Sequence, residues 1–256
     1  MTAPAPAPAP APAPSHTGSR TTRLLGIAVV VGVVALVLLG FFAAPEDDEQ
    51  QDAVRMIFVH VPSAIFTYVA FVTTAIGSAM WLLRRSVWWD TVAGAAAEIG
   101  VLFCGLTLFT GSVWGRPTWN TYWDWGDVRL VTTLILLLMM IGYLSVRSLG
   151  GDERATATRA AVIGVLAAVL MPIVNRSVEW WENNTLHQQS SLTDGNLEDM
   201  TLFTIVVGLV VWGLFFAWSL IHRFRITWLE RELRVSDLDL ALRERRAEGR
   251  AEEGNS

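Results

Sequence analysis

The sequence predicts an all-α membrane protein that crosses the bilayer six times. Its 256 residues are 52% hydrophobic and have a mean hydropathy of +0.42, which is too apolar for an ordinary soluble domain. A helix needs about 20 apolar residues to cross a hydrocarbon core of roughly 30 Å. Six apolar runs are long enough to be candidate spans: residues 24–44, 61–83, 91–113, 130–149, 159–174 and 201–221.

The residues that flank these runs justify each span and orient the chain. The first run follows Arg20 and Arg23 and lacks a small-residue cleavage site, so we interpret it as an uncleaved anchor. The fifth run is the shortest and closes at Pro172. Arginines also follow the second, fourth and sixth runs, and all of them fall on one side of a six-span protein. The positive-inside rule therefore predicts cytoplasmic termini. These arginines are Arg84, Arg85, Arg147, Arg154, Arg159, Arg223 and Arg225.

The chain divides into three parts. Residues 1–23 include six Ala-Pro pairs and predict a disordered cytoplasmic tail. Residues 24–225 form the membrane domain, and residues 226–256 form a charged cytoplasmic extension. In the extension, Val235, Leu238 and Leu242 recur at helical spacing. They favour either a short amphipathic helix on the membrane or a partner, or a solvated helical tail.

The motifs that the chain lacks exclude several function classes. The single cysteine, Cys104, lies in the third run, so the chain cannot form an internal disulfide, and we interpret Cys104 as a packing residue. There is no C-x-x-C-H motif, no Gly-rich phosphate loop and no hydrolase spacing. We therefore expect a chain that is not an enzyme and has no nucleic-acid partner.

Two polar gaps between the runs, residues 114–129 and 180–188, contain half of the twelve tryptophans. Each of these tryptophans alone would fit an interfacial belt. The first gap, however, holds four of them at spacings that no single helix face collects, and Gly115 and Pro117 indicate a non-helical or partly helical segment. Together the four predict a flat apolar platform for a large planar ligand such as haem. The six residues are Trp114, Trp119, Trp123, Trp125, Trp180 and Trp181.

Two of the four histidines, His60 and His187, fall at the outer membrane edge on this topology. His60 stands two residues before Pro62, where we expect the first turn of a helix. A lone histidine would usually be a hydrogen-bonded structural residue, but two on one face with aromatic walls between them favour a bis-histidine iron site. Each ring should then have a hydrogen-bond partner at its other nitrogen. We interpret His16 and His222 as solvated.

Four arginines fall on the outer side, where basic residues are usually depleted. A guanidinium can pair bidentately with the carboxylates of haem. Arg116 and Arg129 rank first because they bracket the tryptophans. Pairing with a neighbouring acidic residue explains each arginine equally well. The arginines are Arg55, Arg116, Arg129 and Arg176, and the acidic residues are Asp124, Asp127, Glu179 and Glu182.

One further acidic residue, Glu98, lies inside the third run. An ionised carboxylate costs about 2.5–3.5 kcal/mol in a membrane span, so Glu98 should face the bundle interior or be protonated. We favour a polar contact between helices over a functional role.

Three segments resemble, in order, the cytochrome c-type biogenesis protein C family, also called haem exporter protein C, among the tryptophan-rich WWD-domain haem handlers. They are residues 58–64 (FVHVPSA), residues 110–130 (TGSVWGRPTWNTYWDWGDVRL) and residues 177–188 (SVEWW…TLHQ). Six spans with an external tryptophan loop also match that family. The resemblance covers most of the chain but leaves out the Ala-Pro tail and the C-terminal extension.

The resemblance implies non-covalent haem b at the outer face of a bacterial cytoplasmic membrane. His60 and His187 would be its axial ligands. The tryptophan loop, including Asp127 and the arginines beside it, would form the platform with Trp180 and Trp181. In that family haem passes to a membrane-anchored periplasmic haem chaperone. A two-subunit ABC transporter and a small single-span protein complete the complex.

The sequence departs from the family pattern at two points. Gly126 separates the last loop tryptophan from Asp127, and about two extra residues lie between Trp181 and Leu186. Two additional helical residues would rotate His187 by roughly 200°. We therefore expect either an irregular segment or a displaced ligand.

Three other functions remain alternatives to a haem exporter protein C. The tryptophan loop alone would also fit the larger haem-ligating relatives of the family. A cytochrome b-like redox protein would need histidine pairs within the hydrocarbon core, which this sequence does not contain. A permease-like subunit without a cofactor would use its tryptophans only as anchors, and it predicts a colourless protein.

Overall fold

The computed structural model describes residues 18–187 and 198–253, with side chains described to residue 247. Within these residues six helices are long and apolar enough to cross a membrane, which confirms the predicted all-α, six-span fold. Short helical segments follow α1 (Leu39–Ala43), precede α2 (Asp52–Met56) and follow α5 (Glu182–Asn184). The six helices are α1 (Arg20–Leu38), α2 (Ile57–Arg84), α3 (Val87–Trp119), α4 (Val128–Ser148), α5 (Glu153–Trp180) and α6 (Asp199–Glu253).

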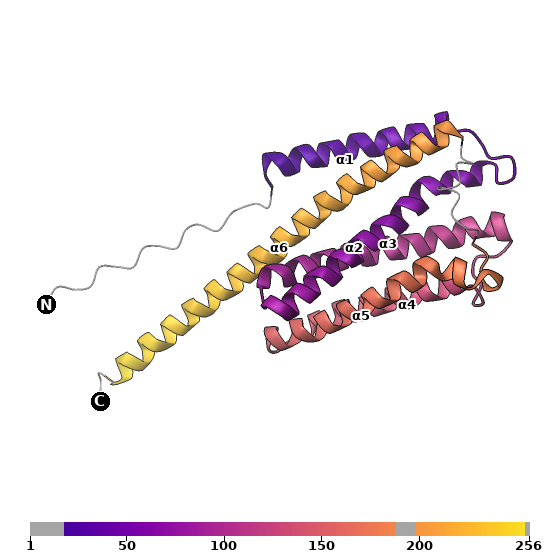
Figure 1. The fold of residues 1–256 in the computed structure, drawn as a ribbon. Helices are drawn as coiled ribbons and strands as arrows, with labels where there is room; N and C mark the ends of the chain where they lie inside the picture. Colours follow the sequence, from indigo (N-terminus) through magenta and orange to yellow (C-terminus); the bar gives the residue numbers. More distant parts are fainter. Residues whose placement is uncertain (1–17, 188–197, 254–256) are drawn as a thin grey trace.

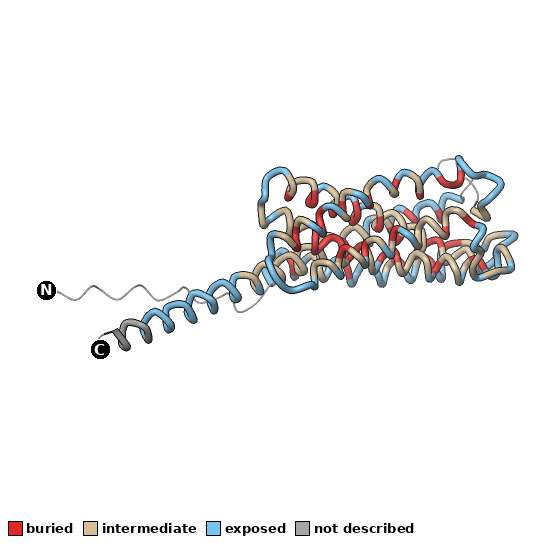
Figure 2. Tube along the Cα trace, turned by 90° about the horizontal axis from the view of Figure 1, so that it is seen from below, coloured by how far each residue is buried: buried red, intermediate tan, exposed pale blue. Residues whose placement is uncertain are grey.

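The helices form a bundle in which the connections alternate between two ends (Figure 1). The segments that join α1 to α2 and α3 to α4, and the turn after α5, lie together at one end, which we call the tryptophan end. The turns between α2 and α3 and between α4 and α5 lie at the opposite, arginine end. Buried positions line the interior of the bundle, and α6 extends beyond it, with residues 232–247 exposed (Figure 2).

The centre of the bundle is packed through small side chains. Helices α2 and α3 approach so closely that a methyl group at Gly77 would lie 2.8 Å from a backbone oxygen of α3, and one at Gly100 would overlap the Phe71 ring. Such small residues let membrane helices pack backbone to backbone. Cys104 is fully buried in the cluster that joins α2 and α3 to α4 and α5, as expected for a packing residue. Larger members of this cluster are Phe71, Leu136, Met140 and Tyr143.

Three helices extend past the predicted ends of their apolar runs. Helix α5 continues beyond Pro172 to Trp180, and α3 continues beyond Pro117 to Trp119. A proline removes one backbone hydrogen bond, and a packed membrane helix tolerates this loss. Helix α6 runs without a break into the extension, where Val235, Leu238 and Leu242 are exposed. The Ala-Pro repeats, His16 and Gln188 lie outside the described residues.

Glu98 makes the interhelical polar contact that we expected from the sequence. The guanidinium of Arg223 on α6 donates two hydrogen bonds to its carboxylate, one of them 2.9 Å long. A second bidentate pair joins Arg147 on α4 to Asp90 on α3 at 2.5 and 3.0 Å. Both pairs cross between helices, so each charge has its counter-charge within the bundle.

Candidate functional site

His60 and His187 line the same cavity at the tryptophan end, although they are far apart in the sequence. His60 lies in the first turn of α2, and His187 follows the short helical turn after α5. The cavity has a volume of about 140 Å³ and lies among α2, α3, α4 and α5. Each ring is fixed by a different set of neighbours.

His60 is held by the outer part of α3. Its Nδ1 lies 3.1 Å from the Thr110 hydroxyl, and its ring meets the Trp114 ring edge-to-face with centroids 5.7 Å apart. The backbone also approaches the imidazole closely, because a methyl group at Gly111 would lie 3.0 Å from Cε1. Thr110 itself donates to the carbonyl of Leu106, so its oxygen has a defined position. The His60 ring therefore has restricted freedom to turn.

His187 is held by a buried carboxylate. Its Nδ1 lies 3.2 Å from Oδ2 of Asp127, and the same oxygen accepts hydrogen bonds from the Leu186 amide at 2.6 Å and the Thr185 hydroxyl at 3.2 Å. The Trp119 ring packs against the imidazole with centroids 4.9 Å apart. One carboxylate thus fixes three successive residues of the segment that carries the histidine.

Asp127 has this position because it also begins α4. Its Oδ1 accepts the Leu130 amide at 2.8 Å, the usual arrangement of a helix N-cap. Asp124 shapes the turn just before it by accepting the Gly126 amide at 2.8 Å. The Asp127 side chain is fully buried, and burial alone would raise its pKa. The hydrogen bonds from His187, Leu130 and Leu186 prevail and lower the pKa to about 2.

The segment between α5 and His187 is irregular, which is the first of the two outcomes expected from its extra length. Helix α5 ends at Trp180, a single 3₁₀ turn follows, and Thr185 is extended. The two additional residues therefore do not rotate His187 along a continuous helix. The extra residue Gly126 is accommodated in the turn that precedes α4, where its amide donates to Asp124.

Two of the six tryptophans contact the histidines, and the other four contact each other in two pairs. Trp114 and Trp119, on the last turns of α3, contact His60 and His187 respectively. Trp123 and Trp125 follow in the loop and meet each other at 66°, so the four rings do not form one continuous flat surface. The Nε1 of Trp123 is buried and has no hydrogen-bond partner among the described residues. Trp180 and Trp181 contact each other, are exposed and do not line the cavity.

Of the four outer arginines, Arg129 alone lines the histidine cavity within the described chain. Its Nη2 donates to the carbonyl of Asn175 at 3.0 Å. Arg176 pairs with Glu179 at 2.6 Å and Arg55 with Asp52 at 2.7 Å, which are local ion pairs. Arg116 donates to the Asn120 carbonyl at 2.6 Å and lies over the Tyr122 ring at the surface.

Several residues that line the cavity or contact its histidines were not predicted from the sequence as site residues. Thr110 and Gly111 hold the His60 ring, yet both sit within an apolar run and resemble ordinary packing residues. Their position one to two helical turns before Trp114 and Trp119 was the available signal, since α3 continues through Pro117. Other lining residues are Thr67, Tyr68, Thr107 and Asn175.

The fold and the site define a polytopic helical membrane protein that brings two histidines and a tryptophan-rich segment together at one end. Residues 9–239 match the family model of heme exporter protein C, and the chain belongs to that family. It is similar to heme exporter protein C of Bradyrhizobium diazoefficiens, with 36% identity over 81% of this chain and 79% of the relative.

Two further relatives support this assignment. Heme exporter protein C of Haemophilus influenzae is 33% identical over 83% of each chain. A putative cytochrome c biosynthesis ccmC-like mitochondrial protein of Marchantia polymorpha is 34% identical over 75% of this chain and 80% of the relative. The similarity therefore extends over most of the length of each relative.

Proposed function

We propose that this protein holds haem b at the tryptophan end, with His60 and His187 as axial iron ligands, and presents it for cytochrome c assembly. The observation that carries the proposal is that two distant histidines line one cavity and that the protein engages Nδ1 of each ring. Nε2 is then the nitrogen assigned to iron. Engagement of the other nitrogen is the usual way in which a protein orients a ligating imidazole.

The donor set fits haem. The described side chains of residues 18–187 and 198–247 contain no group of three or more His, Cys, Asp or Glu placed to hold a bare metal ion. Haem supplies four nitrogens of its own to the iron and leaves two axial positions for protein ligands. Two histidines would therefore supply all the protein ligands that the haem iron needs. Arg129 lines the same cavity, and its guanidinium could pair with a haem propionate.

The cavity that His60 and His187 line is too small to enclose haem as it stands. Its volume of about 140 Å³ is below the roughly 300–1,000 Å³ of ordinary ligand pockets, so the present lining does not enclose a whole macrocycle. We infer that binding widens this end of the bundle. Of the cavity-lining residues, His187 lies outside the helices, in a segment (residues 185–187) that Asp127 fixes through hydrogen bonds.

The proposed role is haem handling and transfer, without an enzymatic reaction in this chain. The names of the relatives, heme exporter and cytochrome c biosynthesis protein, support it. The distribution of arginines supports an outward-facing tryptophan end. We propose that the acceptor is a periplasmic membrane-anchored haem chaperone, and that a two-subunit ABC transporter and a small single-span protein assist release.

Single substitutions of the two histidines test this function. We expect His60→Ala and His187→Ala each to abolish haem transfer to the chaperone and cytochrome c maturation, while membrane insertion remains normal. His16→Ala removes a histidine of the N-terminal tail and serves as the matched control, with maturation unchanged. Normal maturation in both site variants would refute the proposal.

A further inference from the structure

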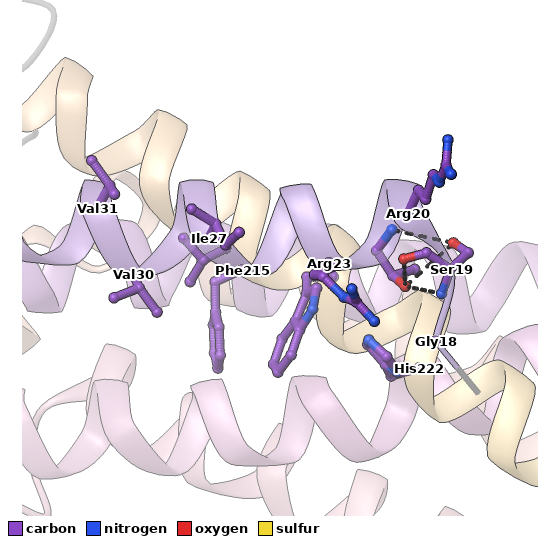
Figure 3. A pocket seen from close by; sticks show the side chains of 13 residues that line it. Gly18, Ser19, Arg20, Arg23, Ile27, Val30, Val31, Phe215 and His222 are labelled. Carbon is purple, nitrogen blue, oxygen red and sulfur yellow. Dashed lines mark hydrogen bonds between the residues drawn. The ribbon is translucent and has the colours of Figure 1, made fainter. Parts of the chain in front are cut away.

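A second, larger cavity opens between α1 and α6 at the arginine end of the bundle (Figure 3). Its volume is about 970 Å³, which is ample for a sizeable ligand. Helix α1 packs chiefly against α6, and the two helices meet closely where a methyl group at Gly26 would lie 3.0 Å from Trp218. His222, which we expected to be solvated, is half-buried here and contacts the Trp218 ring.

One end of this cavity is strongly basic. Arg20 and Arg23 stand one turn apart on α1, and the described lining contains no carboxylate. Neither arginine forms an ion pair with the described side chains of residues 18–187 and 198–247. Figure 3 shows Arg23 directed toward His222 and Arg20 directed outward at the same end. Positive charge without a counter-charge at a membrane edge favours an anionic ligand.

The rest of the cavity is apolar and faces the bilayer. Ile27, Val30 and Val31 of α1 are exposed, and Phe215 of α6 completes the wall. From Arg20 to Val31 the helix rises about 17 Å at about 1.5 Å per residue. One leaflet of a roughly 30 Å hydrocarbon core is about 15 Å deep, so this wall matches the length of an acyl chain.

We propose that this cavity binds an anionic phospholipid of the leaflet at the arginine end. The guanidiniums of Arg20 and Arg23 supply the positive charge that binds the phosphate at this end, and an acyl chain lies along Val30, Val31 and Phe215. Basic pockets between membrane helices on the cytoplasmic side are a known mode of anionic lipid recognition. The positive-inside rule places this end of the protein in the cytoplasm.

The test is titration of the purified full-length protein with dioleoyl phosphatidylglycerol or dioleoyl phosphatidylcholine, followed by native mass spectrometry. We expect preferential binding of phosphatidylglycerol, and a loss of about thirtyfold in its affinity in the double variant R20Q/R23Q. The double variant R84Q/R154Q removes the same charge from the same end, outside this cavity, and should change the affinity less than about twofold.

Two further experiments test where the lipid binds and whether the ligand is a lipid. Val30→Trp places a bulky ring at an exposed position of the wall, so it should reduce lipid binding without disturbing the fold, as circular dichroism would check. A parallel titration with haemin separates a lipid from another anionic amphiphile. Equal binding of the two lipids, equal losses in both arginine variants, or an R20Q/R23Q effect confined to haemin would overturn the proposal.

Discussion

The buried carboxylate of Asp127 and the imidazole of His187 contact each other at 3.2 Å across 60 residues of sequence. This contact links the start of α4 to the segment after α5, because the same carboxylate caps α4 and fixes Thr185 and Leu186. Among the residues that the structure describes, His60 has no comparable acidic contact and relies on a threonine hydroxyl and a tryptophan edge. The two proposed ligands are therefore fixed by different chemistry, and substitutions can address them separately.

Asp127→Asn should separate the capping role of Asp127 from its contact with His187. Asparagine is as good an N-cap as aspartate, so α4 should keep its N-terminal cap, and the loss of stability at neutral pH should be limited to the contribution of the carboxylate charge, about 2 kcal/mol. Loss of the negative charge beside His187 should lower haem retention by about 10- to 100-fold, as for other residues that orient metal ligands. Haem content per protein after purification measures this effect. Unchanged haem content would show that the carboxylate does not orient the ligand.

The low pKa of Asp127 predicts acid sensitivity of the tryptophan end. A carboxyl with a pKa of about 2, against an ordinary 3.8, contributes stability that is fully present above pH 4. That contribution, of about 2 kcal/mol, is lost as the pH falls from about 4 to about 2. Melting temperatures of the wild type and Asp127→Asn should therefore converge over this range. Parallel pH dependence in the two proteins would contradict the assignment.

Gly111→Ala should disturb His60 through a single methyl group. The new carbon would lie 3.0 Å from Cε1 of the imidazole, so the ring must shift. We expect haem retention to fall by about tenfold, in line with other losses of ligand orientation. Gly105→Ala on the same helix is the control, since nothing lies within 4 Å of its methyl position. Equal effects of the two substitutions would point to a general weakening of α3.

Trp119→Leu tests whether the tryptophans act through the ligands. An aromatic contact is worth about 0.5–1.5 kcal/mol beyond burial, so losing the ring on His187 should weaken haem retention about two- to tenfold. Trp180→Leu changes a ring that is 58% exposed and does not line the cavity, and it should have little effect. Equal haem content in both variants would show that Trp119 does not support haem binding and that the tryptophans serve only as membrane anchors.

The pair Glu98–Arg223 should contribute to stability and not to haem retention. Each side chain is 37% exposed, so Arg223→Gln should cost about 1–2 kcal/mol, less than for a fully buried pair. The double variant Glu98→Gln with Arg223→Gln should recover part of this loss, because no lone charge remains in the bundle. Thermal unfolding measures both changes. A double variant less stable than either single one would contradict this view.

The sequence predicted the spans and the convergence of His60 and His187 because these depend on hydrophobic length and on topology. It did not predict their hydrogen-bond partners. Thr110 lies within an apolar helix, and the contact of Asp127 with His187 needs the irregular path after Trp180. The sequence also predicted a flat tryptophan platform, but Trp123 and Trp125 meet at 66°, because ring orientation follows from how α3 ends and from the turn at Asp124. The sequence predicted helical structure in the C-terminal extension, but it did not predict that α6 continues into it without a break, because the extension is polar and lacks an apolar run.

The absorption and electron paramagnetic resonance spectra of haem-loaded protein test the central claim most directly. Two imidazole ligands give six-coordinate, low-spin iron. We expect this signature in the wild type and in His16→Ala, and its loss in both His60→Ala and His187→Ala. A low-spin spectrum that persists unchanged in the two site variants would contradict ligation by this pair.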